Sequence, residues 1–305
     1  MIALLLRRCA LFVPVAALFA LLSFAAIRAL PGGPFDAERS LPPAIEKALR
    51  EKYRLDRPLP RQAAEYVASL ARLDFGPSMR YRNRSVGSIL AESAPASLRL
   101  GALAIAAALV AGPLLGIASV LSGARAGKAA FSLFSGVGLA APPFVLGPLL
   151  VLAFAYALPL FPAVGHGTPR HLVLPVAALA LAPALSLARL VRTGLLETLR
   201  ENFVRTAVAK GCGTGTVLFR HALPHAVPSA IAFLGPASAA VLTGSFAVET
   251  VFALPGLGAH FVHGVLSRDY TLVNGCALLY FTVLYALNAV ADAVALRVDP
   301  RSAAA

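Results

Sequence analysis

Long apolar stretches separated by short polar ones run through most of this chain. Six of them are long enough to cross a hydrocarbon core about 30 Å thick, which takes about 20 helical residues. Uninterrupted runs of this length are typical of helices, which satisfy their own backbone hydrogen bonds in lipid, and not of barrel strands. The pattern therefore predicts an all-α, polytopic membrane protein with about six transmembrane helices. The predicted spans are residues 9–27, 100–124, part of 129–169, 172–188, part of 222–248, and 270–291.

The composition agrees with a membrane protein. Of 305 residues, 58% are hydrophobic and 13% are charged, whereas a soluble globular protein has about 25% charged residues. The net charge of +13 does not require a nucleic-acid partner, because Lys and Arg retained on the cytoplasmic side of a membrane produce the same excess. Cys9, Cys212 and Cys276 are isolated and odd in number, and they predict neither a disulfide framework nor a metal site.

Basic residues predict the orientation. Arg7 and Arg8 precede the first span, which is longer than the ~7–15-residue apolar core of a signal peptide and is expected to stay in the mature protein. With six spans, the cytoplasmic segments are both termini, the loop around Arg125 and Lys128, and residues 189–220. Basic residues exceed acidic ones in these segments, as the positive-inside rule requires.

In this topology residues 31–95 form an external insertion between spans 1 and 2. A segment of this length is translocated largely regardless of its charge. Pro58 and Pro60 predict a break between helical stretches. The chain contains no internal repeat, so we treat residues 1–305 as one transmembrane domain with this insertion. An apolar face for packing on that domain is predicted after the prolines by helical spacing of Ala64, Val67, Leu70 and Ala71.

The cytoplasmic segment 192–224 combines an apolar stripe with basic residues. One helix is predicted over 193–211, and Lys210 followed by Gly211 indicates that it ends in a left-handed cap. Thr214 begins a second short helix, and Pro224 forces another boundary. The residues that define the stripe of the first helix are Leu195, Leu199, Phe203 and Ala207.

The second short helix is predicted to expose an apolar ridge of Val217, Leu218 and Phe219. Such a ridge in water indicates a partner groove that covers it. The basic rim of the ridge consists of Arg205, Lys210 and Arg220.

Ionisable residues are scarce in the predicted spans, which argues against an ion-coupled carrier. Glu249 and Asp292 lie close to span ends, where each is expected to reach an interface. Neither histidine pair, His221 with His225 or His260 with His263, has a local Asp, Glu or Cys to complete a metal site. No nucleophile and base converge, so neither a membrane enzyme nor an assembly scaffold is favoured.

Two further motifs bear on packing and on ATP. Gly112 and Gly116 form a GxxxG pair, which indicates either close approach of two helices or a bent helix packed within its own bundle. The sequence G-x-x-x-x-G-K-[ST] is absent, so the chain has no phosphate-binding loop of the Walker type. If ATP is used, another polypeptide binds it.

The segment 205–224, RTAVAKGCGTGTVLFRHALP, resembles the EAA loop of ABC-importer permeases. Its first two residues depart from the general Glu-Ala pattern, but the form RTA-AKG followed by RHAL is similar to the dipeptide and oligopeptide branch. By this resemblance the residues that couple to the ATPase are Arg205, Thr206, Ala207, Lys210, Gly211, His221, Leu223 and Pro224.

The resemblance extends over nearly the whole chain, to the first membrane subunit of the oligopeptide permeases. Five further motifs follow in the same order: LDFGPSMRYRNRSV (73–86), APPFVLGPLL (141–150), LTGSFAVETVFALPGLG (242–258), SRDYTLVNG (267–275) and VDPR (298–301).

What the resemblance implies is a type I importer fold in a bacterial cytoplasmic (inner) membrane. The implied partners are a second permease, two cytosolic ATP-binding subunits, and a periplasmic or lipid-anchored peptide-binding protein. ATP and Mg would be bound by the partner subunits, and this chain would bind no cofactor. The substrate would be a peptide, with nickel chelates, glutathione or sugars as alternatives. Near the outer mouth, residues 253–258 and the pair Arg268-Asp269 are either path-lining or structural.

Overall fold

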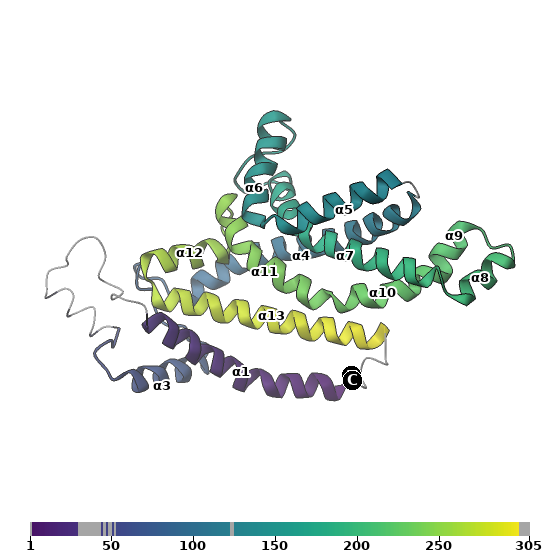
Figure 1. The fold of residues 1–305 in the computed structure, drawn as a ribbon. Coiled ribbons are helices and arrows are strands. Elements are labelled where there is room, and N and C mark those ends of the chain that lie inside the picture. The colour runs from purple at the N-terminus through teal and green to yellow at the C-terminus, as the bar shows by residue number, and fades with distance from the viewer. Residues whose placement is uncertain are drawn as a thin grey trace. The chain divides into compact units, whose positions relative to one another are not determined.

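The computed structural model describes residues 2–29, 44, 47, 51, 53–122 and 125–298. Nearly all of this part is helical (Figure 1), and its extended pairing is limited to an isolated bridge between Pro77 and Ser85. The chain divides into two compact units. Unit 1 comprises Leu98–Leu254 and Ala286–Ala305, and unit 2 comprises Ile2–Ser97 and Pro255–Tyr285. Both α4 (Val86–Leu121) and α13 (Tyr270–Val298) contribute residues to each unit.

Within the described residues, four helices are long and apolar enough to cross a membrane, and two bent helix pairs raise the number to six. The four are α1 (Ile2–Arg28), α4, α7 (Arg170–Thr198) and α13. The fifth candidate joins α5 (Arg125–Ala140) to α6 (Pro143–Val151) and the π-helical turn η1 (Leu152–Ala157). The sixth joins residues 214–232 to α11 (Leu234–Val251) with a bend of 47°. The prediction of about six membrane helices is therefore confirmed.

The span predicted within 129–169 is sharply bent. The axes of its two helical pieces differ by 109°. Pro142 is in an extended conformation (φ −65°, ψ 147°) and Pro143 begins α6. Because proline disfavours helical backbone in the residue before it, the Pro-Pro pair ends α5 and redirects the chain.

In unit 1, α7 packs against α5, α6, α10 (Leu223–Ala232) and α11. The GxxxG pair brings α4 against α7 within this unit. A Cβ atom at Gly112 would lie 2.8 Å from the carbonyl oxygen of Ala184, and one at Gly116 would lie 2.7 Å from that of Ala188. The two glycines therefore allow a backbone-to-backbone approach inside the chain's own bundle.

In unit 2, α1 and α13 pack through aromatic rings. Phe281 stacks on Phe19 with ring centroids 4.7 Å apart, and Tyr285 lies 5.2 Å from Phe12. The hydroxyl of Tyr285 also donates a 2.7 Å hydrogen bond to the carbonyl oxygen of Arg8. These contacts fix one face of α1, while much of its remaining surface is exposed.

Helix α3 (Leu59–Leu70) of the insertion lies beside α1 in Figure 1, and Tyr66 stacks on Phe24 with ring centroids 5.7 Å apart. It begins directly after Pro58, which confirms the proline break; the helical stretch predicted before it falls mostly outside the described residues. The amide of Gln62 donates to the carbonyl oxygens of Leu55 (3.0 Å) and Arg57 (2.7 Å) and ties the preceding turn to the helix.

The predicted apolar face of α3 is confirmed in part, since three of its four residues turn toward α1 and α13. Val67, Leu70 and Ala71 line a groove with residues of α1 and α13. Ala64 is exposed and does not line this groove, so its inclusion in the face was wrong.

Candidate functional site: the segment 202–224

The segment begins with α8 (Asn202–Ala209), a short amphipathic helix of unit 1. Val204 and Ala207 are buried, whereas Arg205 and Thr206 are exposed on the other face. The single helix predicted over 193–211 is wrong, because α7 ends at Thr198 and an extended residue, Glu201, precedes α8. The predicted stripe is therefore split between two helices.

The C-terminal end of α8 is the left-handed cap that the sequence predicted. Gly211 has φ +82° and follows Lys210, the last residue before the turn. The N–H of Gly211 donates to the carbonyl oxygen of Val208 (2.9 Å), and that of Cys212 donates to Ala207 (3.1 Å). This pair of bonds is the Schellman motif, in which a glycine reverses the chain without steric strain.

A second short helix begins at Thr214, as predicted, with α9 (Thr214–Thr216) followed by the π-helical turn η2 (Val217–Ala222). Val217 and Leu218 are buried, so the prediction that both belong to an exposed ridge was wrong. The turn packs on α8 and α7, and Leu218 belongs to the hydrophobic core of unit 1. Only Phe219 of the predicted ridge is exposed, at 58%.

Pro224 lies at the predicted helix boundary, since η2 ends at Ala222 and α10 begins at Leu223. It occupies the second position of α10, where η2 changes to α-helix. A proline is tolerated in the first turn of an α-helix because the N–H that it lacks has no partner there. Leu223 is partly buried against the core of unit 1, and His221 is half-buried.

The segment therefore forms a helix–turn–helix elbow whose polar surface is basic. In Figure 1, α8 and α9 project together from the ends of α7 and α10. Arg205, Lys210 and Arg220 are exposed, and no acidic residue occurs between positions 202 and 224.

Three large apolar side chains are exposed on the elbow: Phe203 (42%), Val208 (56%) and Phe219 (58%). The combination of exposed apolar side chains and a basic rim favours a groove with an apolar floor and an acidic edge as the partner surface. The sequence pattern placed Phe203 in the apolar stripe of one continuous helix and did not single out Val208, so it did not predict that both are exposed on the elbow. The break at Leu199–Glu201 had no glycine or proline to indicate it.

Further contacts within unit 1 lie at and beside the elbow. The ring of His225 lies 5.1 Å from that of Phe203 and links α10 to α8. A Cβ atom at Gly194 would lie 3.1 Å from the Cα atom of Ala226, so α7 and α10 approach closely just before the elbow. His225 is thus in contact with an aromatic ring, and the described residues contain no group of three or more His, Cys, Asp or Glu suited to a metal ion.

The second candidate region, around Arg268-Asp269, is a structural clamp within unit 2. Asp269 is fully buried, and its carboxylate accepts hydrogen bonds from both the insertion loop and the start of α13. The hydroxyl of Ser78 donates to it, and the hydroxyl of Thr271 does so at 2.9 Å. Three backbone N–H groups complete the set: Met79 (3.2 Å), Arg80 (3.3 Å) and Leu272 (3.1 Å).

Neighbouring groups reinforce the clamp. The guanidinium Nε of Arg80 donates to the carbonyl oxygen of Ser267 (2.7 Å). The phenol of Tyr53 donates to the carbonyl oxygen of Ser78 (3.0 Å), and burial, with the nearby Asp269 charge, raises the pKa of this phenol. Five hydrogen-bond donors contact the buried carboxylate of Asp269. This favours a structural role for Asp269 over a path-lining one.

One expectation about acidic residues was wrong. Glu249 is 1% exposed, so its carboxyl group lies inside unit 1 instead of reaching an interface. Its position near the end of α11 suggested exposure, but the chain folds back immediately after the helix. Ala253 has φ +52°, and the N–H of Leu254 donates to the carbonyl oxygen of Glu249 (2.9 Å).

Comparison with known proteins identifies the family of this chain. The profile of the family "Binding-protein-dependent transport system inner membrane component" matches residues 87–303. Among solved structures, a chain described as "Crystal structure of an amino acid ABC transporter with histidines" superimposes with a TM-score of 0.54, covering 69% of this chain and 94% of that one. Its sequence identity is 18%, so it supports the type I importer permease fold alone.

Curated relatives match over almost their full length. The oligopeptide transport system permease protein OppB of Haemophilus influenzae is 38% identical over 92% of each chain, and that of Salmonella typhimurium is 37% identical over 99% of each. The dipeptide transport system permease protein DppB of Bacillus subtilis is 37% identical over 92% of this chain and 91% of its own. This chain therefore belongs to the family of inner membrane components of binding-protein-dependent transport systems.

Proposed function

We propose that this chain is one of two permease subunits of an ATP-driven importer that carries peptides delivered by an external binding protein. The names of its relatives support a peptide substrate. The observation that carries the proposal is the elbow at 202–224, a basic surface with three exposed apolar side chains at the end of a membrane helix.

The elbow is the coupling joint in this proposal. Its outer surface would fill a groove on a cytosolic ATP-binding subunit, with Phe203, Val208 and Phe219 in the groove and the basic side chains at its rim. Closure of two such subunits around ATP would displace the grooves. Because a packed helix transmits displacement instead of absorbing it, the spans would rock between inward-open and outward-open states. The chain itself performs no chemistry on ATP.

The length of α7 supports the placement of the elbow in the cytosol. The helix has 29 residues and is about 43 Å long, so the loop before it and the elbow after it lie on opposite faces of a bilayer. Basic residues concentrate at the elbow end, which the positive-inside rule assigns to the cytoplasm. Both termini are cytoplasmic in the same topology.

Division of labour with an external binding protein fits the composition of the spans. A path for peptides of varied sequence requires tolerance, because tight binding within the path would slow release. Selection by the external protein leaves the permease a path lined by small and aliphatic side chains, and its spans are rich in such residues.

Cysteine crosslinking at the elbow tests the proposal. We would replace Cys9 and Cys212 by serine, leave the buried Cys276, and compare Phe219→Cys with His166→Cys, an exposed position before α7. In the assembled transporter we expect a short thiol crosslinker to join position 219, but not 166, to the ATP-binding subunit. Uptake of labelled peptides, with nickel chelates and glutathione as competitors, identifies the substrate. The proposal fails if position 219 gives no such product or if the purified chain transports solute alone.

A further inference from the structure

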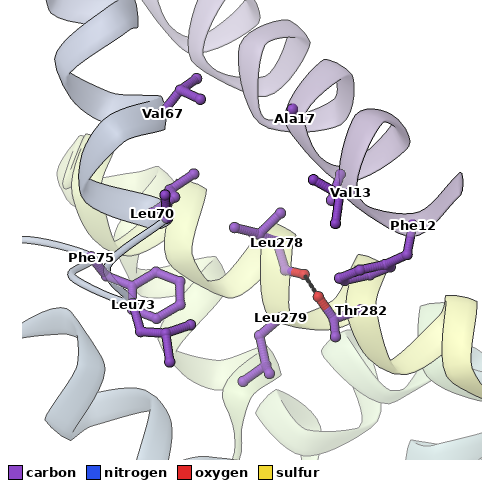
Figure 2. A pocket seen from close by; sticks show the side chains of 12 residues that line it. Phe12, Val13, Ala17, Val67, Leu70, Leu73, Phe75, Leu278, Leu279 and Thr282 are labelled. Carbon is purple, nitrogen blue, oxygen red and sulfur yellow. Dashed lines mark hydrogen bonds between the residues drawn. The ribbon is translucent and has the colours of Figure 1, made fainter. Parts of the chain in front are cut away.

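An apolar groove lies in unit 2 between α1, α3 and α13 (Figure 2). Its volume is about 390 Å³. Side chains from all three helices and from the loop after α3 point into it. The lining includes Val13, Ala17, Leu70, Phe75, Leu278 and Thr282.

The lining of this groove is almost entirely apolar. Among the described residues that form it, Thr282 is the single polar one, and its hydroxyl donates a 2.8 Å hydrogen bond to the carbonyl oxygen of Leu278 in the same helix (Figure 2). A peptide or a hydrated ion placed there would leave its own polar groups without partners. Water would also be unstable in it, since apolar cavities of even about 150 Å³ stay dry and take up apolar molecules.

Along α1 and α13 the groove lies at the depth of the hydrocarbon core, so α3 and the loop after it, which belong to the insertion predicted to be external, would extend into the membrane there. Ala17 is about 16 Å along α1 from Arg28, and Phe12 about 24 Å. Leu278 and Thr282 are about 12 Å and 18 Å along α13 from Tyr270. Both helices are long and apolar enough to cross a membrane, and only 11% of the apolar stretch of α1 and 6% of that of α13 are buried. The surroundings of the groove are therefore lipid chains about 30 Å thick in all.

Leu73, in the loop after α3, supports a hydrocarbon-facing mouth. It lines the groove, is 82% exposed, and has φ +57°, a conformation that is strained for a residue with a Cβ atom. An exposed leucine in a strained turn is poorly placed in water but favourable in lipid. Its charged neighbours Arg72 and Asp74 are exposed and do not line the groove, and the carboxylate of Asp74 accepts a 2.9 Å hydrogen bond from the N–H of Gly76.

We infer that this groove holds one acyl chain of a membrane phospholipid, so that α3 is joined to α1 and α13 through a bound lipid. Between helices in a membrane, van der Waals packing decides association, because lipid and side chain are equally apolar. A retained acyl chain supplies the packing atoms that α3 does not provide itself. The inference uses the membrane assignment and does not depend on which solute is transported.

Native mass spectrometry of the full chain in mild detergent tests this inference. The groove is filled by Ala17→Leu with Ala71→Leu, and the matched control is Ala25→Leu with Ala68→Leu, two exposed alanines on the same helices outside the groove. We expect one phospholipid to be retained by the original chain and by the control, and to be lost from the filled variant. Equal retention in the filled variant and the control would overturn the inference.

Photolabelling provides a readout that does not depend on how the filled variant folds. A phospholipid carrying a diazirine in its acyl chain is incorporated into membranes with the original chain, and the labelled peptides are mapped. We expect label to concentrate on residues 12–17, 67–75 and 278–282 relative to α6, whose apolar side chains are also exposed. Even labelling of all exposed apolar faces would contradict a specific site. Protein adducts from a photocrosslinker at Leu73 would identify a polypeptide as the occupant instead.

Discussion

Replacement of Gly211 separates the shape of the elbow from its chemistry. Gly211 lies in the left-handed region at φ +82°, and a Cβ atom added there would meet no heavy atom within 4 Å. The effect of a substitution is therefore backbone strain and not a clash. A residue with a Cβ atom pays about 1–2 kcal/mol in this conformation, and a β-branched residue such as valine lies at the upper end.

The consequence for coupling follows from this strain. If a partner subunit binds only the turned elbow, Gly211→Val weakens that binding roughly 5- to 30-fold, since about 1.4 kcal/mol corresponds to a factor of ten. Gly211→Asn should lose much less, because asparagine tolerates the left-handed conformation. The matched control is Gly213→Val: Gly213 has φ −68° and ψ 159°, which valine adopts readily, and a Cβ atom added there would likewise meet no heavy atom within 4 Å.

The assay combines three measurements on the same cells: the amount of chain in the membrane, co-purification of the ATP-binding subunit, and uptake of a labelled peptide. We expect Gly211→Val to insert normally, to retain less ATPase and to transport slowly, while Gly213→Val and Gly211→Asn remain close to the original chain. Normal uptake by Gly211→Val would refute the role of the turn. Equal losses in the valine variants at 211 and 213 would show that bulk, and not backbone shape, is responsible.

Three further predictions concern stability. Asp269→Ala removes the acceptor of five buried or half-buried donors and should lower the unfolding free energy by at least about 2 kcal/mol, measured by thermal unfolding in detergent against the exposed Asp74→Ala. Gly112→Ala forces a Cβ atom to within 2.6 Å of the Leu187 Cβ and should cost about 1–3 kcal/mol, whereas Gly136→Ala, with nothing within 4 Å, should be neutral; equal melting temperatures would contradict the α4–α7 contact. Burial, followed by the positive charges of Arg84 and His263, lowers the pKa of His260, and the charge of Glu92 opposes this shift. The contribution of neutral His260 to the stability of the fold is therefore complete above pH ~6.5. It is lost as the pH falls toward the lowered pKa. A thermal midpoint that decreases from pH 7.5 to 5.5 in the original chain, but less in His260→Gln, would confirm this.

The membrane helices were predictable because their signal is a continuous apolar run that no tertiary contact has to supply. The left-handed end of α8 was also predictable, because Lys210 followed by Gly211 specifies that geometry locally. By contrast, the break after Thr198 was not. Leu199 and Arg200 are ordinary helix formers, so neither residue indicates that the helix ends before them.

The burial of single side chains depended on partners distant in sequence. The sequence predicted that Val217 and Leu218 belong to an exposed ridge, because polar residues flank this part of the segment. In the structure η2 packs on α8 and α7, and both side chains are buried. From the sequence, Asp269 could equally line the transport path or have a structural role. Its hydrogen-bond donors Ser78 and Met79 are almost two hundred positions away in the chain, so no local pattern indicated them. A sequence pattern of helical period carries no information on such contacts.

The C-terminal half of α7 explains how motion at the elbow would reach the membrane. Pro175 and Pro183 interrupt the hydrogen-bond ladder in the first half of the helix, where a bend is least costly. From Ala184 to Thr198 the described helix has no proline, and α4 and α10 approach it backbone-to-backbone at Gly116 and Gly194. At such contacts no flexible side chain separates the helices, so a displacement of a few ångströms cannot be absorbed by rotamer changes. A force on the elbow would therefore move this half of α7 together with α4 and α10, and any bending would occur at the prolines.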